Sequence, residues 1–373
     1  MLSARFIYAS LMLALERPMD FVPVVLAFLV SLLVVIVTMP PLIRKMRDGG
    51  MVGRDVNKRD RPQVAELGGI AAVFAFSVSL SLVVGILKVV GTIWEPPYLA
   101  AISVFFIAAM IGLIDDISNI KQRVKAAAVV FASLPLLLVH FKLWTDGTVI
   151  TNLSSYIANN IDIAKNAFIA LPLGGIIDFR SMPYVYWFVL VPIGVTGVAN
   201  AMNMSAGYNG LESGQIAVVS GSLFFVAAIR AAPESLLIFA ALVGAALGLF
   251  SFNRHPARVF VGDIGTLGLG AVIAAGAIIG GLEFWGLVAI APAYYEAGAT
   301  FYYGVLRKVD RRSACHGPRI SEDGALSPPP GAERYTLAYL LLSRWPMTER
   351  KLVATLLGLY ALSGIAAVVL ALV

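Results

Sequence analysis

Ten apolar segments, each close to the length of a membrane-spanning helix, limit what this chain can fold into more than any other feature. A helix needs about 20 apolar residues to cross the hydrocarbon core of a bilayer. With 59% of its residues hydrophobic and only 13% charged, the chain has too few charges to cover a water-exposed surface. The segments are 21–43, 67–87, 98–114, 126–141, 182–202, 213–229, 235–252, 264–282, 284–306 and 352–373. The sequence therefore predicts an all-α polytopic membrane protein of about ten spans, with a single integral membrane domain over residues 1–373.

Basic residues are distributed unevenly between the loops that join these segments. If the N-terminus lies outside, the inside loops hold 21 of the 28 Lys and Arg residues, which agrees with the positive-inside rule. This orientation places both termini outside. The net charge of +6 then reflects topology and does not indicate a nucleic-acid partner. The first 20 residues are expected to remain on the chain as an interfacial or partly inserted segment.

Polar residues gather in four segments that this orientation places on the inside face. They are GRDVNKRDRPQVAELGG (53–69), DDISNIKQRVK (115–125), NAMNMSAGYNGLESGQ (200–215) and FNRHPARVFVGDIG (252–265). Scattered interfacial polarity would populate both faces, so the clustering favours an enzyme site on one face.

A membrane transporter is the main alternative class, and it would place ionisable groups near the bilayer midplane. Only Glu296, about midway along 284–306, fits that description. Its carboxyl group is expected to pair with a neighbouring helix or stay protonated. A place beside a groove for a lipid phosphate is the functional alternative.

Three residues of the inside segments are candidate metal ligands. Asn200 and Asn203 share a helix face, and an amide oxygen suits Mg²⁺ or Mn²⁺. Asp263 precedes an apolar helix, where an acid could equally be a plain capping residue.

The adjacent acids Asp115 and Asp116 end an apolar helix. Neighbours on a helix point about 100° apart, so the two acids are expected to have different partners. Basic residues as far as Lys125 follow them. The pattern fits either ordinary salt bridges at the end of a helix or a site that binds metal and phosphate.

Several motifs together resemble the polyprenyl-phosphate N-acetylhexosamine-1-phosphate transferases of glycosyltransferase family 4. They are GRDVNK, LIDDISNIKQRVK, NAMNMSAGYNGLESGQ, RVFVGD and PMTERK, and their order and spacing match from about residue 18 to the C-terminus. The closer branch uses UDP-N-acetylglucosamine and dolichyl phosphate, and the short last inside loop favours an archaeal source. The resemblance implies ten helices, a cytosolic-face site and Mg²⁺, with Mn²⁺ as a substitute. It also implies transfer of N-acetylglucosamine 1-phosphate to a polyprenyl phosphate with release of UMP, or the same chemistry with another UDP-N-acetylhexosamine.

The resemblance also implies roles for individual residues. Asp115, Asp116 and Lys125 would be catalytic, and Asn203 and Asp263 would hold the metal. In the mechanism we favour, Asp115 organises Lys125, and Asp116 faces the metal and phosphate region. The implied substrate-binding residues include Lys58 and Glu66 of the first inside loop, and Asn119, which would contact a sugar hydroxyl. Gly207, Asn209 and Phe260 would form the nucleotide pocket, with Phe260 stacking on the base. The others are Asn200, Glu212, His316 and Arg319.

Two departures from the family pattern leave the identity of the transferred sugar undetermined. The first lies in residues 307–350, the implied sugar-recognition loop, where Cys315 stands in place of an arginine. The second is Gln122, which replaces an aromatic residue. The expected location is the plasma membrane of a prokaryote, or the endoplasmic reticulum membrane in a eukaryote. The oligomeric state stays open, a homodimer included.

Overall fold

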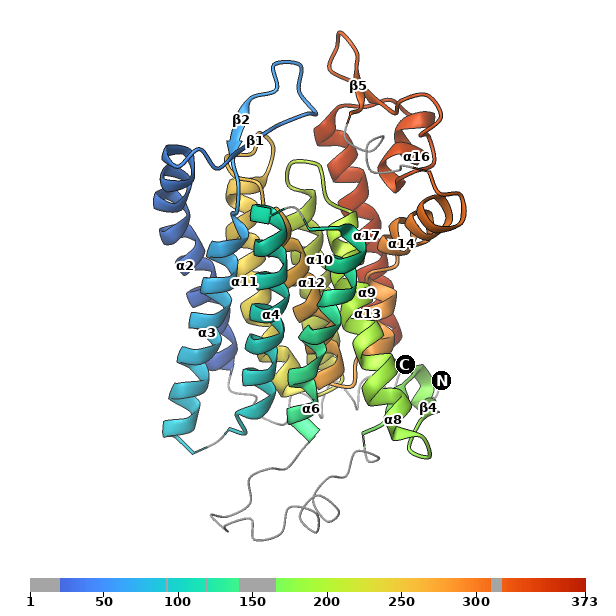
Figure 1. Ribbon diagram of the computed structural model, residues 1–373. Coiled ribbons are helices and arrows are strands. Elements are labelled where there is room, and N and C mark those ends of the chain that lie inside the picture. The colour runs from blue at the N-terminus through green and yellow to red at the C-terminus, as the bar shows by residue number, and fades with distance from the viewer. Residues whose placement is uncertain (1–20, 92, 119, 141–165, 310–316) are drawn as a thin grey trace.

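The computed structural model describes residues 21–91, 93–118, 120–140, 166–309 and 317–373, and in them the chain is mainly helical (Figure 1). Eight helices of this described part are long and apolar enough to cross a membrane. They are α2 (Phe21–Asp48), α3 (Gly69–Val89), α4 (Pro96–Ser118), the continuous run of α8, η3 and α9 (Pro183–Met204), α10 (Leu211–Ile229), α11 (Pro233–Asn253), α12 (Gly262–Ile279) and α17 (Glu349–Ala371). The protein is therefore a polytopic integral membrane protein.

Two of the ten predicted segments do not form single long helices. Segment 126–141 corresponds to three short consecutive helices, α5 (Gln122–Ala128), η1 (Val129–Ser133) and α6 (Leu134–His140). Segment 284–306 is interrupted after α13 (Glu283–Ala289) and continues as α14 (Ala293–Ala299) and η4 (Thr300–Leu306). Pro292 precedes α14 and has no backbone N–H to donate, which explains why the helix does not run through.

The loops contain small β-hairpins that the prediction of an all-α chain omits. They pair β1 (Val52–Arg54) with β2 (Gln63–Ala65), β3 (Phe168–Ala170) with β4 (Ile176–Asp178), and β5 (Arg319–Ile320) with β6 (Leu326–Ser327). Strands of two or three residues are too short to show the alternating pattern that identifies a strand. The short helix α16 (Leu337–Arg344) follows the last hairpin.

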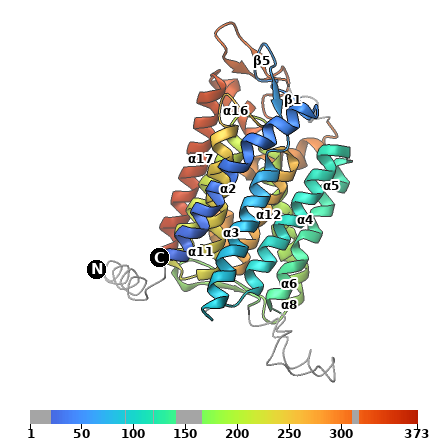
Figure 2. The ribbon, with the colours of Figure 1, turned by 90° about the vertical axis from the view of Figure 1, so that its left-hand side faces the viewer.

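Helix α12 lies at the centre of the bundle. In its apolar stretch 83% of the residues are buried, whereas in the peripheral helix α2 only 17% are. Figure 2 shows α2, α3 and α4 side by side on one face of the bundle. Helix α4 packs closely on the start of α12 because Gly112 has no side chain. A Cβ atom at Gly112 would lie 2.3 Å from the backbone oxygen of Asp263.

The polar segments of the sequence meet at one end of this bundle. The β1–β2 hairpin, the loop between α9 and α10, β5 and α16 all lie at the upper end in Figure 1, whereas the β3–β4 hairpin lies at the lower end. Helix α2 begins and α17 ends at the lower end. The chain thus brings the loops after α2 and α9 together with the segment before α17.

Candidate active site

A cavity of about 820 Å³ opens at the polar end of the bundle. Ten of the residues singled out by the sequence line it: Glu66, Lys125, Asn200, Asn203, Gly207, Asn209, Glu212, Phe260, Asp263 and Glu296. They come from five separate parts of the chain. Cavities of this volume accommodate whole small-molecule ligands.

A cluster of charged and amide groups occupies one wall of the cavity. Lys125 Nζ lies 2.7 Å from Asp115 Oδ2 and also contacts Asp263 Oδ2. Asn203 Nδ2 donates to Asp263 Oδ1 and to Thr266 Oγ1, both at 2.7 Å. The Lys125 and Asp115 side chains are 4% and 5% exposed, whereas Asp263 is 27% exposed and reaches the cavity. The cluster thus presents one accessible carboxylate backed by a buried ion pair.

Asp115 reaches Lys125 because the chain turns sharply after α4. The Ile120 backbone N–H donates to Asp115 Oδ1 at 2.7 Å, and α5 then begins at Gln122. This turn folds α5 back beside the end of α4, so residues ten positions apart form an ion pair. The pairing of Asp115 with Lys125 is the one that the sequence analysis favours.

Asp116 has a different partner from the one expected. Its Oδ1 accepts from the backbone N–H of Asp263 at 2.9 Å, and its Oδ2 accepts from that of Ile264 at 3.0 Å. Asp116 therefore caps the N-terminus of α12 from outside that helix, and Gly262, with φ +75°, makes room for it. The alternative in which Asp263 caps its own helix is wrong, because the N-cap position is Val261 and the Asp263 carboxylate is bonded elsewhere.

The first inside loop is joined to the segment that carries Phe260. Ala65 forms a parallel bridge with Val259, and the Phe260 backbone N–H donates to the Ala65 oxygen at 2.7 Å. Glu66 follows directly, so it shares this part of the cavity with Phe260. A Cβ atom at Gly53 would lie 2.4 Å from Glu66 Oε1 and 3.2 Å from the Phe260 ring. Burial raises the pKa of the Glu66 carboxyl above its ordinary value.

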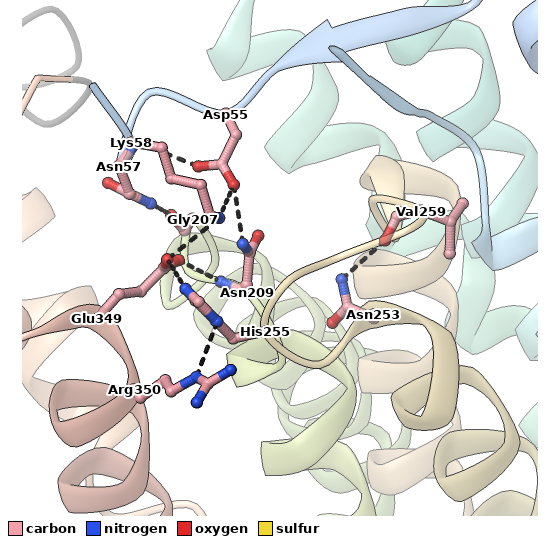
Figure 3. A network of polar contacts seen from close by, with 10 residues as sticks. All are labelled: Asp55, Asn57, Lys58, Gly207, Asn209, Asn253, His255, Val259, Glu349 and Arg350. Carbon is pink, nitrogen blue, oxygen red and sulfur yellow. Dashed lines mark hydrogen bonds and ion pairs between the residues drawn. The ribbon is translucent and has the colours of Figure 1, made fainter. Parts of the chain in front are cut away.

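The loop between α9 and α10 forms another wall and is held by side chains from elsewhere (Figure 3). Asn57 Nδ2 donates to the Gly207 oxygen at 2.7 Å, and Glu212 Oε1 accepts from the Gly207 N–H at 3.0 Å. Asn209 contacts two acids: its N–H donates to Glu349 Oε1 and its Nδ2 to Asp55 Oδ2, each at 2.8 Å.

The remaining predicted residues fall into three groups. Asn200 lines the cavity, but its Nδ2 donates to the backbone oxygens of Thr196 (2.8 Å) and Ala126 (3.4 Å). Lys58 and Arg319 do not line it, and Arg319 lies exposed on β5. Asn119 and His316 lie outside the described residues.

Glu296 is buried and lies on the cavity wall. Its Oε1 accepts from the backbone N–H of Leu337 at 2.7 Å, in the first turn of α16. The prediction that this acid finds a partner on a neighbouring helix is confirmed. The contact links the broken helix α14 to the segment that follows the β5–β6 hairpin.

Three polar residues near the site were not predicted from the sequence. Asp55 and Glu349 bind Asn209, and Thr266 binds Asn203. Arg123, one of the basic residues that follow the acidic pair, lines the cavity. Asp55 and Glu349 stand inside the quoted motifs GRDVNK and PMTERK, and that position is the only signal that could have found them.

The oxygen donors of the site suit a hard cation. Among the described residues no group of three or more His, Cys, Asp or Glu side chains could hold a metal. Mg²⁺ needs no such cage, since proteins bind it through one or two carboxylates while substrate phosphates and water fill the other positions. The accessible Asp263 carboxylate beside the Asn203 amide fits that donor set.

Comparison with known proteins gives a consistent picture. Residues 98–281 match the model of the family described as Glycosyl transferase family 4. A protein of Saccharolobus solfataricus is 28% identical over 265 residues, which cover 70% of this chain and 73% of the relative. A protein of Sulfolobus acidocaldarius is 28% identical over 261 residues, which cover 67% and 69%. Both are named as UDP-N-acetylglucosamine–dolichyl-phosphate N-acetylglucosaminephosphotransferases.

A bacterial relative carries a different name. A phospho-N-acetylmuramoyl-pentapeptide-transferase of Gloeothece citriformis is 28% identical over 287 residues, which cover 74% of this chain and 69% of the relative. The two kinds of relative share a transferred phosphosugar and differ in the sugar. The matched region contains Asp115, Lys125, Asn203 and Asp263.

Proposed function

We propose that the chain is a member of glycosyl transferase family 4 and that it transfers N-acetylglucosamine 1-phosphate from UDP-N-acetylglucosamine to a polyprenyl phosphate such as dolichyl phosphate. The products are polyprenyl diphosphate N-acetylglucosamine and UMP, so the reaction starts a lipid-linked glycan. The observation that carries the proposal is the position of Lys125 between Asp115 and Asp263 on the wall of a cavity of about 820 Å³.

The proposed reaction is a displacement at phosphorus. An oxygen of the polyprenyl phosphate forms a bond to the β-phosphorus of the UDP-sugar. The bond from this phosphorus to the oxygen that bridges it to the α-phosphorus breaks, and UMP leaves with the electron pair. Phosphoryl transfer depends on positioning and charge neutralisation more than on covalent help from the protein.

Lys125 supplies the fixed positive charge of this mechanism. Its ammonium group would bind the pyrophosphate of the donor, and Asp115, buried beside it at 2.7 Å, keeps it in place. A phosphate monoester has a second pKa near 6, so the acceptor is largely a dianion at about pH 7 and needs no strong base. Asp115 is therefore an organiser of Lys125 in this proposal, and Asp116 holds the start of α12 under Asp263.

Mg²⁺, or Mn²⁺ in its place, would be held by Asp263 and Asn203 and would neutralise charge on the pyrophosphate. Direct binding tests this assignment without turnover. Titration of Mn²⁺ into the protein, followed by electron paramagnetic resonance, should show affinity reduced at least about tenfold in Asp263→Asn. Glu66→Gln, a change in the same cavity, should bind Mn²⁺ as the wild type does. Equal affinity of wild type and Asp263→Asn would remove Asp263 from the metal site.

The nucleoside of the donor would occupy the part of the cavity formed by Phe260, Glu66, Gly207 and Asn209. Phe260 offers a ring for base stacking, and Glu66 offers a carboxylate to hydroxyl or N–H donors. Their attachment through the Ala65–Val259 bridge supports a preformed site.

One assay tests the whole proposal. The purified protein in lipid nanodiscs is given Mg²⁺, a polyprenyl phosphate and a panel of UDP-sugars, and release of UMP is measured. Turnover with UDP-N-acetylglucosamine is expected. Preference for UDP-N-acetylmuramoyl-pentapeptide would move the protein towards its bacterial relatives, and no turnover with any UDP-N-acetylhexosamine would refute the proposal.

The proposed location is the plasma membrane of a prokaryotic cell, with the cavity on the cytosolic face. Support comes from the basic loops, which meet at the cavity end of the bundle. Alkaline phosphatase fused after Val373 should then be exported and active, because α17 ends at the opposite end. An inactive fusion would contradict this orientation.

A further inference from the structure

Six polar side chains form a network at the edge of the cavity, and the proposed reaction uses only one of them, Asn209. They are Asp55, Lys58, Asn209, His255, Glu349 and Arg350, and Figure 3 shows them converging from four separate segments. Three of these segments also supply residues to the cavity wall. The fourth is the first turn of α17, whose Glu349 lies outside the cavity lining.

Glu349 is the centre of this network. Its side chain is only 4% exposed. Oε1 accepts from the Asn209 backbone N–H at 2.8 Å, and Oε2 lies 3.4 Å from Lys58 Nζ and 3.5 Å from His255 Nε2. Both carboxylate oxygens therefore bind residues from other parts of the chain.

The loop that Glu349 contacts contains two glycines in left-handed backbone conformations. Gly207 and Gly210 have φ angles of +122° and +89°, where glycine is strongly favoured and backbone freedom is greatest. Contacts from other parts of the chain help to order this loop, and Asn209 makes two of them, one to each acid. Removing either acid would release one of these contacts.

Lys58 supplies the positive charge that compensates the two buried carboxylates, Asp55 and Glu349. It contacts Asp55 Oδ2 and Glu349 Oε2, so one cation serves two carboxylates that are almost completely buried. A buried carboxylate without such a partner is strongly unfavourable. Lys58 thus acts within this network, although the family resemblance implies a place at the substrate.

We propose that Glu349 is a positioning residue of the transfer site, which holds Asn209 and its loop in the shape that receives the nucleotide part of the donor. The inference rests on the proposed function for its substrate. Glu349 does not line the cavity, so it acts through Asn209, which does. The interaction is the same before and during transfer, and its loss should weaken donor binding more than the chemical step.

The first test is steady-state kinetics of the full-length protein with UDP-N-acetylglucosamine varied at saturating polyprenyl phosphate. In Glu349→Ala, KM for the donor should rise about tenfold while kcat changes less than about threefold. Glu349→Gln retains an oxygen for the Asn209 N–H, so its KM should rise less than in Glu349→Ala. Glu234→Gln is the matched control, an acid in the first turn of α11 at the other end of the bundle, and its KM should equal that of the wild type.

Hydrogen–deuterium exchange tests the positioning without any turnover. The Asn209 amide should exchange at least about tenfold faster in Glu349→Ala than in the wild type, with α11 and α12 unchanged. Unchanged protection at Asn209, or equal loss of protection throughout α11 and α12, would overturn the inference. If the wild type shows no turnover, the proposed function fails, while this exchange measurement still decides the role of Glu349.

Discussion

Asp116 on α4 accepts a hydrogen bond from the backbone N–H of Asp263, 147 positions later at the start of α12. Its second oxygen binds the next N–H, that of Ile264, at 3.0 Å. A carboxylate at this position satisfies two of the N–H groups that a helix leaves without partners and is favoured by the helix dipole. Two helices distant in sequence are thus joined directly beneath the accessible carboxylate of the cavity.

Replacing Asp116 with asparagine should destabilise the protein. The amide keeps one acceptor oxygen and loses both the second acceptor and the charge, so we expect the free energy of unfolding to fall by about 1 to 2 kcal/mol. Unfolding in mixed detergent micelles, followed by circular dichroism, measures this. Asp178→Asn, which removes an exposed acid from β4, is the control and should remain close to the wild type. Equal stability of both variants would contradict the capping role.

Replacing Asp115 with asparagine distinguishes two roles for this residue, as an organiser of Lys125 or as a proton acceptor. We expect kcat to fall about 100-fold, because the ammonium group of Lys125 loses its buried partner. The pH–rate profile should keep its shape, since the acceptor phosphate is already ionised above about pH 6. Kinetics from pH 6 to pH 9 check this. Recovery of most of the rate at high pH would show that Asp115 removes a proton.

His255 should make the stability of the protein depend on pH. Burial, with the positive charges of Lys58 and Arg350 nearby, lowers the pKa of this imidazole, although Asp55 opposes the shift. Its Nδ1 accepts from Arg350 Nε at 3.0 Å, and Nε2 faces Glu349. The unfolded chain therefore binds the proton at higher pH than the folded protein does. The stabilisation is complete above the unfolded pKa, decreases as the pH falls below it, and is fully lost once the pH has fallen through the lower pKa of the folded protein.

The comparison that isolates this effect is His255→Asn. The melting temperature of the wild type should fall more than that of the variant between pH 7.5 and pH 5.5, in the same detergent. His255→Asn removes the titrating group, so its remaining pH dependence reports the other acids and bases. A wild type and variant whose melting temperatures fall in parallel would show that His255 does not contribute.

Most of the helices were predictable from hydrophobic length, and loop charge placed Asn203 and Asp263 on the same face of the membrane. Their pairing at one site was implied only by the family resemblance. The network around Glu349 was not predictable. Glu349 binds Asn209 across 140 positions and Lys58 across 291, and an acid in the first turn of a helix is also explained by the helix dipole alone. The misassigned cap at α12 has the same origin, since the capping acid, Asp116, comes from another helix.

Substitutions of Glu296 test whether this acid has a structural role or must carry a negative charge in the reaction. Its Oε1 accepts from the Leu337 N–H at 2.7 Å, and Thr336 caps the same turn of α16 through Tyr339. Glu296→Gln keeps an acceptor oxygen and should retain both activity and the protection of Leu337 against hydrogen exchange. Glu296→Ala removes the acceptor, so exchange at Leu337 should become about tenfold faster, because a hydrogen bond of this kind contributes about 1 kcal/mol. Trypsin cleavage after Arg334 should become faster in Glu296→Ala for the same reason. Loss of activity in Glu296→Gln with Leu337 still protected would instead show that the negative charge takes part in the reaction.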